Sequence, residues 1–124
     1  MARILVIEDN ADNMVLTAML LESAGHTVLR AIDAEAGLTM ARAESPDLIL
    51  MDIQLPGMDG LAATAILKQD PSTRAVPVLA LTALAMKGDE ERIRAAGCDG
   101  YIAKPISIQS FLATIAEQVA LLDA

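Results

Sequence analysis

The sequence is poor in aromatic residues and in cysteine. It contains one phenylalanine, one tyrosine and no tryptophan, so its 54% hydrophobic content comes from alanine, leucine, isoleucine, valine and methionine. Small aliphatic side chains of this kind suit helices that pack closely on a buried sheet. The single cysteine, Cys98, cannot form an internal disulfide and has no companion at metal-ligand spacing. We therefore expect Cys98 to be a packing residue.

The sequence is also short of positive charge and of long hydrophobic runs. Nine Lys and Arg residues face seventeen Asp and Glu residues, which gives a net charge of −8. This excess opposes attraction to phosphate backbones and anionic lipid, so we expect no direct nucleic-acid binding and no membrane association. No apolar run reaches the roughly 20 residues that cross a bilayer, and no basic segment precedes an apolar one at the start. These absences predict a cytoplasmic protein.

Apolar runs, helical periodicity and punctuation by Gly and Pro predict strands that alternate with helices. The 124 residues match the size of one domain, and we expect residues 1–124 to form a single domain without a separate output module. The expected strands are 3–7, 27–30, 48–52, 76–81 and 100–103. The expected helices are 11–24, 34–43, 61–69, 87–96 and a last one that follows Ser107.

Five strands that alternate with five helices favour parallel pairing through right-handed crossovers. The predicted fold is α/β: a doubly wound, flavodoxin-like (βα)5 sandwich around a five-stranded parallel sheet. The common strand order for such a sheet is 2-1-3-4-5, with a switch point between the first and third strands. Because parallel strands end at one edge of the sheet, the residues that follow them should meet there.

Polar residues end four of the five predicted strands. They are Glu8 and Asp9 after the first strand, Asp52 at the end of the third, Thr82 after the fourth and Lys104 after the fifth. Three neighbouring carboxylates repel one another unless a cation neutralises them. Oxygen ligands without His or Cys favour Mg²⁺ or Mn²⁺ over zinc. Lys104 can bind an anion and Thr82 adds a hydroxyl donor, a combination that suits phosphoryl chemistry.

Each of these residues also has a plainer explanation. Exposed strand ends often carry Asp or Glu, a Lys beside acids can be a weak surface ion pair, and Thr is common in strands. Tyr101, in the predicted fifth strand, is either a half-buried structural residue or a switch residue that rotates. The combination of all four strand ends is what favours a functional site.

Several segments together resemble the receiver domains of two-component response regulators, over essentially all 124 residues. The segments are 6–10, 46–52, 55–60, 80–83 and 101–105. Any one of them is weak, but together they are specific. Further similarity in 85–94, 97–98 and 104–107 is closest to single-domain regulators of the DivK cell-division type. Very similar segments occur in receivers of hybrid histidine kinases, so an excised piece of such a kinase is the alternative.

The resemblance implies that Asp52 accepts a phosphoryl group from a phosphohistidine on a histidine kinase or histidine phosphotransferase. It implies that Asp9 and Asp52 bind Mg²⁺ directly, that Glu8 acts mainly through water, and that the backbone carbonyl of Gln54 completes the protein ligands. Mn²⁺ can substitute for Mg²⁺ in such a site. The implied module is no enzyme beyond its own phosphorylation and dephosphorylation.

The resemblance also implies a switch. Lys104 and Thr82 would hold phosphoryl oxygens, Thr82 would move toward the phosphoryl group, and Tyr101 would turn inward. The face between Met86 and Gln118 would then contact a downstream protein target, with the chain as a monomer or weak dimer. A cis peptide bond before Pro105 is a further implication.

Two rival functions remain open on the sequence. A metal-dependent phosphatase with an aspartyl intermediate needs the same residue types. Such enzymes generally place a second Asp where this chain has Gln54, and they need a substrate pocket for which the chain leaves little room. The other rival is a pseudo-receiver that binds partners and is never phosphorylated.

Overall fold

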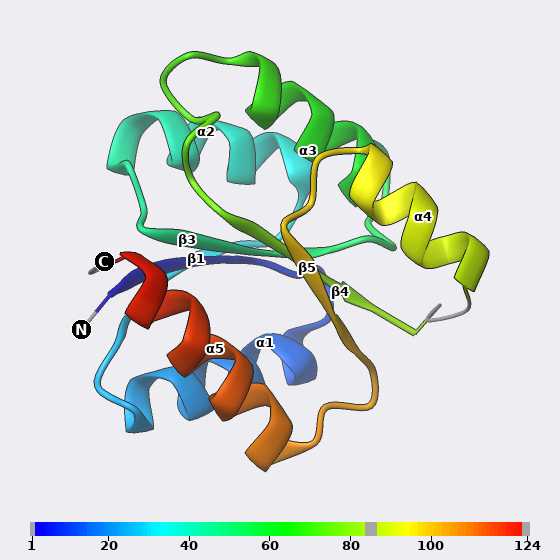
Figure 1. Cartoon of the computed structure of the whole chain (residues 1–124). Helices are drawn as coiled ribbons and strands as arrows, with labels where there is room; N and C mark the ends of the chain where they lie inside the picture. Colours follow the sequence, from blue (N-terminus) through cyan, green and yellow to red (C-terminus); the bar gives the residue numbers. More distant parts are fainter. Residues whose placement is uncertain (1, 84–86, 123–124) are drawn as a thin grey trace.

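The computed structural model describes residues 2–83 and 87–122. Within these residues, strands and helices alternate along the chain (Figure 1). The strands are β1 (Arg3–Ile7), β2 (Thr27–Ala31), β3 (Leu48–Asp52), β4 (Val78–Thr82) and β5 (Gly100–Ala103). The helices are α1 (Ala11–Ser23), α2 (Ala34–Glu44), α3 (Gly60–Gln69), α4 (Lys87–Ala95) and α5 (Ile108–Leu122). Met86, which begins the predicted contact face, lies outside the described residues.

The strands form one parallel sheet in the order β2-β1-β3-β4-β5. Figure 1 shows the sheet between two layers, with α2, α3 and α4 on one face and α1 and α5 on the other. The predicted doubly wound, flavodoxin-like fold and its strand order are confirmed. All five strands end at one edge of the sheet, which we call the carboxyl edge.

Each face of the sheet has its own hydrophobic core because side chains alternate along a strand. In β1, Leu5 and Ile7 pack toward α2, α3 and α4, whereas Ile4 and Val6 pack toward α1 and α5. The strands β3 and β4 are buried along their whole lengths. Cys98 is buried in the first of these cores, as expected for a packing residue.

Three helices begin at the carboxyl edge with the same side-chain cap. Asn10, Asp33 and Asp59 each accept a hydrogen bond from the backbone N–H three residues ahead, at 2.9, 2.8 and 2.8 Å. The cap supplies an acceptor to an N–H that has no partner inside the helix. The residue that caps α1 is therefore Asn10.

The structure corrects the predicted start of β4. The strand begins at Val78 rather than at residue 76. Val76 donates its N–H to the carbonyl of Thr73 in a turn, and Pro77 has no N–H to donate to the sheet. No helix in the described part of the chain combines the length and the apolar character that a membrane crossing requires.

Phe111 should contribute strongly to stability because it is fully buried between α5 and the sheet. We expect Phe111→Ala to lower the free energy of unfolding by about 3–5 kcal/mol. Gln109→Ala, at an exposed position of the same helix, should change it by less than about 0.5 kcal/mol. Urea unfolding followed by circular dichroism measures both, and equal effects of the two substitutions would contradict this description of the core.

Candidate functional site

The carboxyl edge brings together the acidic residues predicted from the sequence. Glu8 and Asp9 follow β1, and Asp52 ends the neighbouring strand β3. One carboxylate oxygen from each lies within 4.8 Å of the others. Glu8 is 1% exposed and Asp52 is 3% exposed, whereas Asp9 is exposed. We call these three residues the acidic cluster.

Lys104 joins the acidic cluster from the end of β5. Its Nζ lies 3.1 Å from Oδ2 of Asp52 and 3.3 Å from Oε1 of Glu8. The Lys104 backbone N–H donates to the carbonyl of Thr82 at 2.8 Å, which ties the end of β5 to the end of β4. The peptide bond between Lys104 and Pro105 is cis, as the family resemblance implied.

Backbone N–H groups orient the two buried carboxylates. The N–H of Gln54 donates to Oδ1 of Asp52 at 2.9 Å, and the N–H of Asn10 donates to Oε2 of Glu8 at 3.3 Å. Each buried carboxylate therefore has one oxygen bonded by the backbone and the other by Lys104. Sequence reasoning missed the amides of Asn10 and Gln54, because residue type carries no signal for a backbone donor.

Close packing of these charges changes their proton affinities. Burial, together with the hydrogen bond to Asp52 and its negative charge, raises the pKa of Glu8 from 4.5 to about 7. Burial opposes the charging of Lys104, but the hydrogen bond and charges of Asp52 and Glu8 outweigh burial and raise the Lys104 pKa. Lys104 is therefore an ammonium group across the physiological pH range.

The acidic cluster has the donor set of a divalent-cation site. It offers only carboxylate oxygens, which are the ligands that Mg²⁺ prefers. With all three carboxylates ionised, three negative charges face the one ammonium of Lys104, so two negative charges stay uncompensated within this group. A divalent cation fits that charge and that chemistry.

The two predicted switch residues lie on neighbouring strands near the site. Thr82 is buried at the end of β4. Tyr101 in β5 is half-buried, and its hydroxyl donates to Oε2 of Glu90 on α4 at 3.5 Å. The contact of Tyr101 with Glu90 was not predicted from the sequence. Exchange of Thr82 and Tyr101 between two arrangements stays a prediction.

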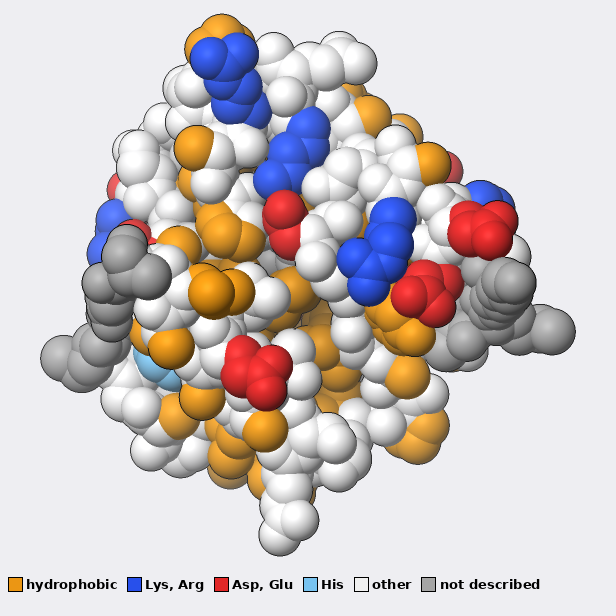
Figure 2. Space-filling model, viewed as in Figure 1, with side chains coloured by type: hydrophobic (Ala, Val, Ile, Leu, Met, Phe, Trp, Pro, Cys, Tyr) orange, Lys and Arg blue, Asp and Glu red, His pale blue; other side chains and the backbone are white. Residues whose placement is uncertain are grey.

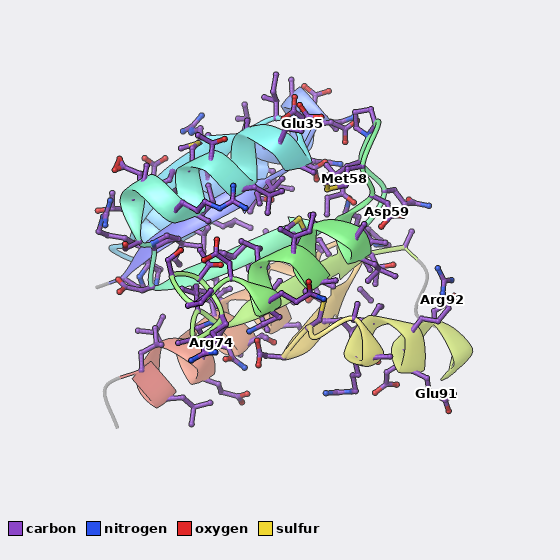
Figure 3. The ribbon with its side chains drawn as sticks, turned by 90° about the horizontal axis from the view of Figure 1, so that it is seen from above. Glu35, Met58, Asp59, Arg74, Glu91 and Arg92 are labelled. Atoms are coloured by element: carbon purple, nitrogen blue, oxygen red, sulfur yellow. The ribbon has the colours of Figure 1, made fainter. Side chains whose placement is uncertain are left out.

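One cavity borders the acidic cluster, and a second lies between the start of α2 and the loop that precedes α3. The first, of about 180 Å³, lies beside α1 and is lined by Glu8, Asn13, Leu16, Lys104, Pro105 and Ile106. The other, of about 120 Å³, is lined by residues 33–35 and 56–58. Figure 3 shows Glu35, Met58 and Asp59 together at this end of α2 and α3, with Arg74 at the opposite end and Glu91 and Arg92 on α4. The first cavity therefore gives Glu8 and Lys104 an open space beside α1.

The stability of the metal-free protein should fall as the pH rises from about 4.5 to about 7. In this window the unfolded chain has lost the Glu8 proton while the folded protein still holds it, so rising pH favours unfolding. The loss should reach at most about 3 kcal/mol and be complete above the folded pKa.

Urea unfolding in the presence of a chelator, repeated across this pH range, measures the effect. Glu8→Gln should remove this component, whereas Glu117→Gln at an exposed position of α5 should retain it. The assignment fails if wild type and Glu8→Gln lose stability in parallel.

The chain is similar to proteins of known class over most of its length. Residues 4–116 match the family described as the response regulator receiver domain. The polar-differentiation response regulator DivK of Brucella anthropi is 51% identical over 112 residues, which cover 90% of this chain and 91% of that protein. DivK of Brucella ovis is similar to the same extent.

Solved structures agree with this match. The receiver domain of a sensor histidine kinase from Pseudomonas aeruginosa, which holds a magnesium ion in its active-site cleft, has a TM-score of 0.89 and 34% identity, covering 96% of this chain and 98% of that one. A CheY-like receiver domain protein from Methanospirillum hungatei has a TM-score of 0.89 and 28% identity, covering 98% and 95%. The resemblance drawn from the sequence is confirmed, and the chain belongs to the response regulator receiver domain family of two-component systems.

Proposed function

We propose that residues 1–124 act as one receiver module that accepts a phosphoryl group on Asp52. The donor would be a phosphohistidine on a histidine kinase or histidine phosphotransferase. The observation that carries the proposal is the environment of Asp52: it is buried, its Oδ1 is held by the amide of Gln54, and its Oδ2 lies 3.1 Å from Nζ of Lys104. A carboxylate oriented in this way is positioned as a nucleophile.

In the proposed reaction a carboxylate oxygen of Asp52 attacks the phosphorus atom of the donor. The new O–P bond forms as the P–N bond to the donor imidazole breaks, and the electron pair of that bond returns to the imidazole. Lys104 neutralises negative charge on a phosphoryl oxygen, and the Thr82 hydroxyl donates a hydrogen bond to another. The protein contributes positioning and charge neutralisation.

Glu8, Asp9, Asp52 and the backbone carbonyl of Gln54 would hold Mg²⁺, with Mn²⁺ able to take its place. When bound, the ion neutralises charge on the phosphoryl oxygens. Two findings support this assignment: the oxygen-only donor set of the acidic cluster, and the magnesium ion in the related P. aeruginosa receiver domain.

Phosphorylation would bias the pair formed by Thr82 and Tyr101 and so change the face built by α4, β5 and α5. The direct contact of the Tyr101 hydroxyl with Glu90 supports a link between the strand and α4. This face, from Lys87 to Gln118 in the described residues, would bind a downstream protein target. The module would act by protein contact, as a cytoplasmic monomer or weak dimer, and catalyse only its own phosphorylation and dephosphorylation.

Exposed hydrophobic side chains on α1 and α5 favour a protein as the donor. Six of the seven large hydrophobic residues that are exposed in the described part of the chain lie on α1 and α5. They are Val15, Leu16, Met19, Ile108, Leu121 and Leu122. Figure 2 shows hydrophobic side chains gathered over the half of the molecule that holds α1 and α5, with Lys and Arg mainly over the other half. Such a patch is typical of a protein-binding surface.

The wild-type protein incubated with Mg²⁺ and acetyl phosphate should gain the mass of one acid-labile phosphoryl group per chain. Asp52→Asn should gain none, because the amide is not a nucleophile, and a chelator should abolish the gain in wild type. Asp47→Asn, which changes an exposed aspartate before β3, should be phosphorylated like wild type. Intact-mass spectrometry measures all four samples.

The outcomes separate the proposal from its rivals. No mass gain in wild type with any phosphodonor, phosphohistidine proteins included, would favour a pseudo-receiver. Steady turnover of a small phosphoester would favour a phosphatase. Equal labelling of wild type and Asp52→Asn would show that the phosphoryl group is carried elsewhere.

A further inference from the structure

The loop between β3 and α3 begins after Asp52, and its last part, at Gly60, lies next to Asp52 again. Gly60, the first residue of α3, is buried and donates its N–H to the carbonyl of Ile53 at 2.9 Å. The hydroxyl of Thr64 donates to the Gly60 carbonyl at 2.8 Å. Both backbone groups of Gly60 are therefore bonded, and its N–H closes a loop that begins directly after the phosphoacceptor.

Gly60 lies against the backbone of Asp52 itself. A Cβ atom at this position would lie 2.8 Å from Cα of Ile53 and 3.0 Å from the carbonyl carbon of Asp52, and it would overlap the Asp52 carbonyl oxygen. These are backbone atoms, so no rotation of a side chain can make room. A side chain at position 60 would have to push the end of β3 or the start of α3 away.

Other glycines in the chain do not share this environment. At Gly88 a Cβ would meet open space. At Gly37, in α2, the atoms nearest to a Cβ would all belong to the Ile7 side chain, and none to the main chain. Gly60 is thus distinguished by contact with the main chain of the phosphoacceptor.

The closed loop fixes the amide that orients Asp52. Gln54 lies between Ile53 and Leu55, and both neighbours are held in place. The Ile53 carbonyl accepts the hydrogen bond from the Gly60 N–H, and the Leu55 side chain is buried in the core. The Gln54 N–H donates to Oδ1 of Asp52 at 2.9 Å. Opening the loop at Gly60 would move this amide relative to the carboxylate.

We propose that Gly60 is a positioning residue for phosphorylation: its missing side chain lets α3 close the loop onto Asp52 and holds the Gln54 amide on the Asp52 carboxylate. This inference rests on the proposed function, since it assigns Gly60 a part in the reaction of Asp52. Gly60 acts through Gln54 and touches no reacting atom.

The test compares Gly60→Ala with Gly37→Ala, a buried glycine of another helix whose Cβ contact is with a side chain. Gly60→Ala should slow phosphorylation by acetyl phosphate about tenfold or more, because small displacements of reacting groups carry large rate costs. Gly37→Ala should slow it by no more than about twofold. Rates are measured by intact mass at a temperature where urea unfolding shows each variant to be fully folded.

The backbone amide resonance of Gln54 gives a readout that a purely structural role would not change. In isotope-labelled wild type this resonance reports the bond to Asp52, and Asp52→Asn provides the reference with that bond altered. Gly60→Ala should shift the Gln54 resonance toward the reference position, and Gly37→Ala should leave it in place.

Asp59→Ala serves as a second variant if Gly60→Ala does not fold. It removes the 2.8 Å cap at the start of α3 and adds no atoms. Asp33→Ala removes the equivalent 2.8 Å cap from α2 and is its control. Asp59→Ala should shift the Gln54 resonance and slow phosphorylation more than Asp33→Ala does.

The inference is overturned if the α3 variant matches its control in rate, or if the Gln54 resonance stays at its wild-type position. If wild type itself takes no phosphoryl group, the proposed function fails. The Gln54 resonance of the same variants then still decides whether Gly60 positions Asp52.

Discussion

The pairing of one ammonium group with two buried carboxylates is the interaction on which the carboxyl edge of this protein depends. Lys104 reaches Asp52 and Glu8 at 3.1 and 3.3 Å. Each carboxylate is almost fully buried, and an unpaired charge in that position costs several kcal/mol. In the sheet order β3-β4-β5, Lys104 starts two strand spacings, or roughly 10 Å, from Asp52. Only a long side chain can cross the end of β4 and bridge that gap.

Backbone N–H groups supply the second hydrogen bond of each buried carboxylate. Each buried carboxylate receives one bond from Lys104 and one from a backbone amide two residues further along the chain. Asp9 is the exposed member of the acidic cluster, so it is the member that solvent and ions reach first. A pair of oriented carboxylates beside an accessible one suits the proposed binding of a cation and transfer of a phosphoryl group.

The fold could be predicted because strands alternate with helices along the chain, and the residue types of the site could be predicted because they follow the ends of those strands. Apolar strands that end in Glu8, Asp9, Asp52, Thr82 and Lys104 place those side chains at one edge of any parallel sheet. The predicted start of β4 was wrong because Val76 has the apolar side chain of a strand residue, but its N–H donates a hydrogen bond within a turn. The amides of Asn10 and Gln54, and the close approach of Gly60 to Asp52, depend on backbone geometry that residue type does not encode.

The proton affinity of Lys104 tests the central pairing most directly. Titration of the metal-free protein, followed by the chemical shift of Lys104 Cε, should give a pKa above the ordinary value of 10.5, because Asp52 and Glu8 stabilise the ammonium. The same titration in Asp52→Asn should give a lower pKa than in wild type, since burial then opposes charging with one partner fewer. A wild-type pKa at or below 10.5, unchanged in Asp52→Asn, would contradict the account.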